Sequence, residues 1–156
     1  MAELTPTIAG ALATRYLKLA GSLRELAAPL SEEQFWTKPF PFGNSFGHLV
    51  LHLTGNLNYY IGAQIAGTGY VRDRPREFTE AAPPSKAAAL IKFEEAVEMV
   101  VRTIRQQSAA DWSTPYSATG AADVRDRFEM VLQCATHLHH HIGQMMYLCF
   151  AMNKRA

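Results

Sequence analysis

The sequence predicts an all-α protein: a four-helix bundle with a long crossover between its second and third helices. Four segments repeat apolar residues at spacings of three and four, and no segment alternates apolar and polar residues as a strand does. A polar connection of about 20 residues separates the second segment from the third, which is typical of a crossover in a bundle. The 156 residues suit a single domain, residues 1–156.

The first predicted helix begins at Thr5, a suitable N-cap, with Pro6 in the first helical position, and it ends before Pro29. Residues 30–44 contain prolines, a glycine and aromatic residues, and predict a short helical turn followed by an aromatic-anchored loop. The apolar stripe of the first helix is Ile8, Leu12, Tyr16, Leu19, Leu23 and Leu26.

The second helix is predicted from about Ser45 to Ala66, and the polar, Gly- and Pro-rich crossover follows it. Ser85 can cap the third helix, and the fourth is predicted from about Asp123 to Met152 with the most regular period in the chain. The apolar stripe of the second helix is Phe46, Leu49, Leu53, Leu57 and Tyr60. That of the third helix is Leu90, Phe93, Val97, Val100 or Val101, and Ile104. That of the fourth helix is Val124, Phe128, Val131, Ala135, Leu138, Ile142, Met145, Cys149 and Met152.

The composition argues against a nucleic-acid or membrane partner. The formal net charge is only +1, because 15 Lys and Arg are balanced by 14 Asp and Glu, whereas nucleic-acid-binding proteins usually have a basic excess. No basic stretch precedes the first apolar residues, and no run of about 18 apolar residues occurs. We therefore expect a soluble, cytoplasmic protein.

All six histidines lie in the predicted second and fourth helices. Residues four apart lie on one side of a helix, so His137 and His141 form a pair, as do His48 and His52. The helical phase directs His137 and His141 toward the apolar face and places His52 beside the column of Leu49 and Asn56.

The other histidines are expected elsewhere on their helices. His140 falls on the polar side, His139 lies at the far edge of the apolar face, and both are expected in solvent. His48 is rotated further from the stripe than His52, and it is either an outer group of the site or a ligand in place of His52. A single histidine beside an apolar face is usually a hydrogen-bonded core residue. Three inward imidazoles from two helices favour a metal site at His52, His137 and His141.

The segments "NSFGHLVLHLTGNLNYYIG", "RDRPREF" and "HLHHHIGQMMYL" resemble, in this order, the DinB/YfiT-like superfamily of bacterial four-helix bundles. The shared elements are a second-helix histidine before a Gly-Asn pair, an Arg-Asp-rich crossover and a fourth-helix His-x-x-x-His-x-Gly-Gln. Matched residue by residue, the family's metal-binding histidines fall on His52, His137 and His141. The resemblance implies one divalent metal ion per chain, zinc or nickel, and a homodimer.

The resemblance also implies two classes of activity on a small molecule: transfer or isomerisation that uses a low-molecular-weight thiol, and metal-dependent hydrolysis. Three neutral imidazoles leave positions open for water or substrate, as in catalytic sites. The sequence contains no obvious general base, and the Glu-x-x-His pattern of di-iron bundles is absent around these histidines. The alternative is a non-catalytic, stress-related protein that binds a metal or a ligand.

Further candidates for the site lie near the histidines or in the crossover. Asn56 and Gln144 each lie within about one turn of a predicted ligand, and each either orients an imidazole or serves only in helix packing. Four charged crossover residues either form an anion-binding lip for a carboxylate-bearing thiol or substrate, or pair among themselves. They are Arg72, Asp73, Arg74 and Arg76.

Overall fold

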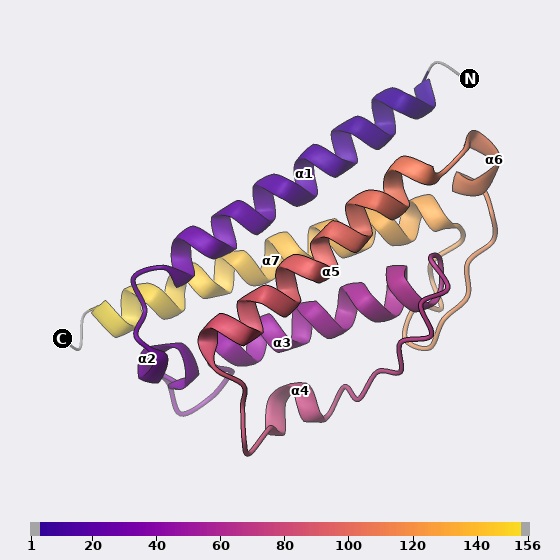
Figure 1. Cartoon of the computed structure of the whole chain (residues 1–156). Coiled ribbons are helices and arrows are strands. Elements are labelled where there is room, and N and C mark those ends of the chain that lie inside the picture. Colours follow the sequence, from indigo (N-terminus) through magenta and orange to yellow (C-terminus); the bar gives the residue numbers. More distant parts are fainter. Residues whose placement is uncertain (1–3, 154–156) are drawn as a thin grey trace.

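The computed structural model describes residues 4–153, and it contains helices and loops but no strand within that range. Four long helices form a bundle (Figure 1), which confirms the predicted fold class. In chain order the helices are α1 (Leu4–Ala27), α2 (Glu32–Trp36), α3 (Phe46–Leu57), the π-helix η1 (Asn58–Ala63), α4 (Arg76–Thr79), α5 (Lys86–Gln106), α6 (Ala109–Trp112) and α7 (Arg127–Asn153).

The order of the helices explains the long crossover. In Figure 1, α1 and α7 run in one direction along the bundle, and α3 and α5 run in the other. Helices α1 and α3 each pack against both α5 and α7. Because the consecutive helices α3 and α5 are parallel, residues 64–85 must return along the length of the bundle between them. This segment includes α4, which packs against α3, and it brings crossover side chains to the middle of α3.

The predicted apolar stripes form the core of the bundle. The side chains of Tyr16, Leu53, Phe93 and Leu138 are almost fully buried, one from each long helix. The buried Tyr16 hydroxyl donates a hydrogen bond to the Val131 carbonyl oxygen at 2.7 Å, and this bond joins α1 to α7. None of the helices in residues 4–153 is both long enough and apolar enough to cross a membrane.

Two predicted helix starts are wrong. Helix α1 already includes Leu4, so Thr5 lies within its first turn and does not precede it. Helix α7 begins at Arg127 and not near Asp123, because the Asp126 carboxylate accepts a hydrogen bond from the Glu129 backbone N–H at 2.9 Å, as an N-cap does. The predicted cap at Ser85 is confirmed, since its side chain accepts a backbone N–H of the first helical turn. Ser45, predicted as the approximate start of the second helix, caps α3 in the same way.

The second predicted helix changes its winding before it ends. Regular α-helix stops at Leu57, and η1 continues only to Ala63, not to Ala66. Within η1, the Tyr60 carbonyl accepts the Tyr116 hydroxyl at 2.9 Å, a contact with the loop that precedes α7. A π-helix adds residues to each turn, so side chains after Leu57 no longer follow the phase of α3.

Candidate metal centre

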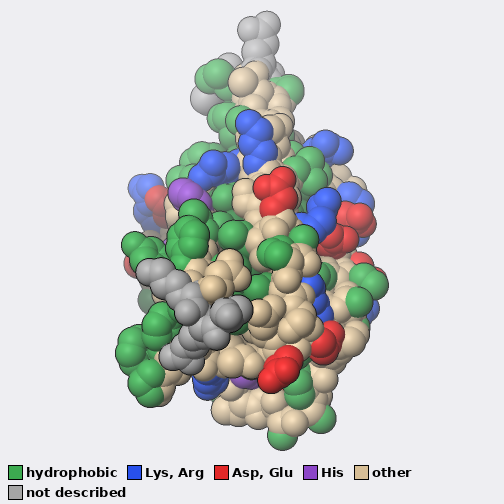
Figure 2. Space-filling model, turned by 90° about the vertical axis from the view of Figure 1, so that its left-hand side faces the viewer, with side chains coloured by type: hydrophobic (Ala, Val, Ile, Leu, Met, Phe, Trp, Pro, Cys, Tyr) green, Lys and Arg blue, Asp and Glu red, His purple; other side chains and the backbone are tan. Residues whose placement is uncertain are grey.

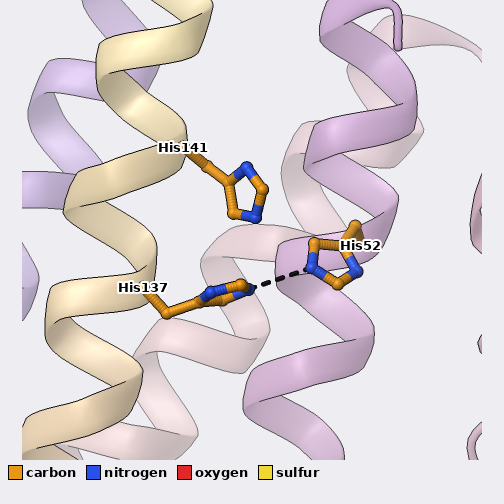
Figure 3. Close-up of side chains that lie close together, drawn as sticks. All are labelled: His52, His137 and His141. Carbon is orange, nitrogen blue, oxygen red and sulfur yellow. Dashed lines mark hydrogen bonds between the residues drawn. The ribbon is translucent and has the colours of Figure 1, made fainter. Parts of the chain in front are cut away.

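Three histidines from two facing helices meet inside the bundle (Figure 3). His52 comes from α3, and His137 and His141 come from α7. One ring nitrogen of each lies within 4.8 Å of a ring nitrogen of the other two, and the Nε2 atoms of His52 and His137 are 2.9 Å apart. The structure thus brings together the three side chains predicted as metal ligands.

The crossover supplies a carboxylate that orients His52. The Glu77 side chain accepts a hydrogen bond from His52 Nδ1 at 2.8 Å. Burial opposes ionisation of Glu77, but hydrogen bonds from His52 and Arg72 outweigh it and lower the pKa of this carboxyl. An ionised carboxylate can only accept, so Nδ1 of His52 carries the proton and Nε2 presents a lone pair to the cluster.

Glu77 is itself held by Arg72. The guanidinium donates from Nε to Oε1 at 2.7 Å and from Nη2 to Oε2 at 2.9 Å, a bidentate pair. Both side chains are only 7% exposed. The carboxylate lies against α3 at Gly55, where a Cβ atom would come within 2.1 Å of Glu77 Oε1. A glycine at this position therefore makes room for the pair.

Gln144 orients the third histidine in the same way. His141 Nδ1 lies 2.7 Å from the Gln144 carbonyl oxygen and donates to it. Nε2 of His141 is buried and has no hydrogen-bond partner within residues 4–153. A buried unpaired nitrogen is costly, and a metal ion at the cluster would satisfy it.

His137 and His141 are neutral near pH 7, the form that binds a metal. Burial, with smaller contributions from the neighbouring histidines, lowers the pKa of His137 to about 4. Burial also lowers the pKa of His141, against the opposing effect of its hydrogen bond to Gln144. No proton has to be removed from these two imidazoles when a metal ion binds.

The cluster fits a small divalent ion. Zinc–nitrogen bonds of about 2.0 Å put the ligand nitrogens of a tetrahedral site about 3.3 Å apart. The three nitrogens here lie within 4.8 Å of one another, so small rotations of the rings would give that spacing. The donor set is all imidazole, which suits zinc and nickel among other metals. The three-histidine site can hold a divalent metal.

The other three histidines lie outside the cluster. His48 Nδ1 is 2.7 Å from the Ser45 hydroxyl, and its ring packs edge-on against Trp36. His139 is exposed beside Arg15, which lies 3.3 Å from its Nδ1. His140 is exposed as expected, but it also lines the cavity next to the cluster, and Gln144 Nε2 lies 3.2 Å from its Nε2.

That cavity has a volume of about 880 Å³ and lies between α3, η1, α7 and the crossover. His52 and His137 form part of its wall, together with Asn56 and the η1 residues Tyr59 and Tyr60. A cavity of this size suits a small organic molecule. A substrate there would lie directly against His52 and His137 of the cluster.

The structure does not gather the charged crossover residues into one lip. Arg72 and Arg74 line the cavity, but Arg72 is neutralised by Glu77. Arg76 points elsewhere and pairs with Glu80 at 2.5 Å, and the Asp73 carboxylate accepts the Arg76 backbone N–H. Because Asp73 and Arg76 form these contacts within the crossover, they do not belong to the predicted anion-binding lip.

Sequence reasoning missed Glu77, the partner of both His52 and Arg72. Its signal in the sequence is the one glutamate of the arginine-rich segment "RDRPREF", whose other acidic residue is Asp73. No helical spacing relates residue 77 to residue 52, because the contact depends on the path of the crossover along α3. The Gly-Asn pair after His52 was a further signal, since Gly55 is the position that Glu77 covers.

Fold and site together define a helical bundle with a three-histidine cluster that can hold a metal ion. Residues 16–145 match the DinB superfamily, so the chain belongs to that family and the resemblance noted in the sequence is confirmed. Among curated proteins, none matches the chain significantly.

Proposed function

We propose that the protein is a metal-dependent enzyme that acts on a small molecule, by transfer to or from a thiol or by hydrolysis. The observation that carries this proposal is the position of the three-histidine cluster beside a cavity of about 880 Å³, with His52 and His137 in the cavity wall. A closed structural metal site has four protein ligands and needs no cavity. Three ligands beside a cavity are the arrangement of a catalytic site.

In this proposal His52, His137 and His141 hold one divalent ion per chain, zinc or nickel. Such an ion, when bound, lowers the pKa of a coordinated water or thiol and so supplies a nucleophile at neutral pH. Glu77 and Gln144 are positioning residues, because each holds a histidine in the tautomer that presents Nε2. Both oxygens of Glu77 are already occupied by His52 and Arg72, so Glu77 does not serve as a general base.

The lining of the cavity favours a small substrate that has an apolar portion. Met130 and Cys134 are buried parts of its wall, and Tyr59 and Tyr60 add aromatic surface. Burial raises the pKa of the Cys134 thiol to about 12, so this cysteine stays protonated and is no nucleophile. The thiol in the proposed reaction therefore comes from a second small molecule.

Turnover by the metal-loaded protein tests the proposal. We expect zinc- or nickel-loaded protein to accelerate the reaction of an electrophile with one of several low-molecular-weight bacterial thiols, or the hydrolysis of one of a set of esters. The activity should disappear with a chelator, return with the metal, and be lost in His141→Gln but kept in His139→Gln. Stoichiometric metal binding without turnover of any substrate would favour the non-catalytic alternative.

We also propose that the protein forms a homodimer through the outer face of α7. Figure 2 views the molecule from the end where α7 finishes, and hydrophobic side chains gather along one side of that view. Tyr147 and Phe150 of α7 are 75% and 58% exposed, and Phe42 of the loop before α3 is 72% exposed. Large aromatic side chains that are this exposed are typical of a surface that binds another protein.

The mass in solution tests the dimer. We expect twice the chain mass in analytical ultracentrifugation at micromolar concentration, and the mass of one chain for the double variant Tyr147→Glu, Phe150→Glu. Ile91→Glu is the matched control, since Ile91 is an exposed apolar residue of α5. A monomeric wild type, or a dimer that survives the double substitution, would contradict this interface.

A further inference from the structure

The cavity beside the three histidines is cationic. Its lining includes Arg72 and Arg74 but no aspartate or glutamate of residues 4–153. Three neutral imidazoles leave the charge of a divalent ion uncompensated, so the metal would add to this positive field. A cavity lined by one sign of charge attracts ligands of the opposite sign.

Arg74 is the arginine available to a ligand. Glu77 engages Arg72 through two hydrogen bonds, whereas the Arg74 side chain makes no ion pair or hydrogen bond with the rest of the described chain. The Arg74 guanidinium lies over the Phe78 ring, with its central carbon 5.6 Å from the ring centre. This contact holds the charge at the wall of the cavity without neutralising it.

Asn56 gives independent evidence for a polar ligand. Its side chain lines the cavity and is buried, with 7% of the residue exposed. The amide oxygen is buried and finds no hydrogen-bond partner among residues 4–153. Buried amides are almost always hydrogen-bonded, so an unpaired one at a cavity wall indicates a group that the protein itself does not contain. Asn56 follows His52 by one helical turn and so lies next to the cluster.

We propose that the cavity binds a small organic carboxylate that also carries an amide or similar hydrogen-bonding group. The carboxylate pairs with Arg74, the hydrogen-bonding group meets Asn56, and the reactive end lies at His52, His137 and His141. This inference rests on the proposed function, because it assigns the substrate class of the same site. It makes Arg74 and Asn56 specificity-determining residues.

Matched ligands test the role of Arg74. Mercaptoacetylglycine carries a thiol, an amide and a carboxylate, and its glycinamide analogue differs in lacking the negative charge. By calorimetry on zinc-loaded protein, we expect the acid to bind about tenfold more tightly than the amide, the effect of one charge-assisted contact. Arg74→Gln should abolish this preference. Arg76→Gln, two residues away and paired with Glu80, should retain it.

A second comparison tests Asn56. The ligand 5-mercaptopentanoate has the same chain length as mercaptoacetylglycine but no amide. Asn56→Leu should weaken the binding of mercaptoacetylglycine several-fold and change that of 5-mercaptopentanoate little, in protein with wild-type zinc content. Equal losses for both ligands would overturn the role of Asn56.

The outcomes separate this inference from the proposed function. Equal affinity for the acid and the amide in the wild type, or a preference that survives Arg74→Gln, would overturn the anion site while the metal site stands. A preference insensitive to Arg74 would mean that the carboxylate binds the metal directly. Failure of the wild type to bind zinc would instead refute the proposed function.

Discussion

His52→Ala, His137→Ala and His141→Ala are each expected to weaken zinc or nickel binding by more than about 100-fold. Each substitution removes one of only three protein ligands, a larger loss than the 10–100-fold typical of an outer partner. The measurement is metal content after dialysis, supported by competition with a chromogenic chelator. Circular dichroism should show that the variants keep the helical content of the wild type.

The remaining histidines provide the controls for this result. His139 is exposed beside Arg15, and His48 contacts Ser45 and Trp36, so alanine at either position should leave the affinity nearly unchanged. His140→Ala should also retain metal, although it opens the cavity wall. Stoichiometric metal in His137→Ala together with loss in His139→Ala would refute the assignment of ligands.

The inward-facing histidines could be predicted because they lie in regular helix. Helix α7 keeps an uninterrupted apolar period, so the phase at His137 and His141 follows from that of Leu138 and Met145. The π-helix begins at Asn58, after His52, so the change of winding does not disturb the phase at this residue. It does displace Tyr59 and Tyr60, and their position on the cavity wall could not be obtained from a period of 3.6.

The two residues that orient the histidines, Gln144 and Glu77, differ in how far the sequence could predict them. Gln144 is three residues from His141 on one helix, and its contact is local. Glu77 reaches His52 only because the crossover runs along α3, and the path of a connection of about 20 residues is not encoded in any local spacing. For the same reason, the charge run of the crossover could not be divided by inspection into Arg72, which supports the site, and Arg76, which does not.

Gly55 and Gly143, which lie in the two helical segments that resemble the DinB family, provide the second prediction, because the structure gives them different roles. Gly55→Ala is expected to lower metal affinity about 10–100-fold and to destabilise the protein by roughly 2–4 kcal/mol. The new Cβ would lie 2.1 Å from Glu77 Oε1 and 2.9 Å from its Cδ. The carboxylate must move, and it then leaves Arg72 buried without its partner and His52 without its acceptor.

Gly143→Ala is the matched control for Gly55→Ala. Gly143 lies in α7 between His141 and Gln144, but a Cβ atom there meets nothing within 4 Å. Alanine favours helix over glycine by about 0.5–1 kcal/mol, so this variant should bind metal normally and unfold at a slightly higher temperature. Thermal unfolding of the chelator-treated proteins measures the stabilities, and chelator competition measures the affinities.

Glu77→Gln separates the loss of the carboxylate from the steric effect of the alanine. Glutamine keeps the shape of the side chain, but its amide no longer has two charged acceptor oxygens for Arg72 and His52. We expect an affinity loss similar to that of Gly55→Ala, and little further loss in the double variant, because both changes break the same contact. Additive losses in the double variant, or wild-type affinity in Gly55→Ala, would show that Glu77 does not orient His52 for the metal.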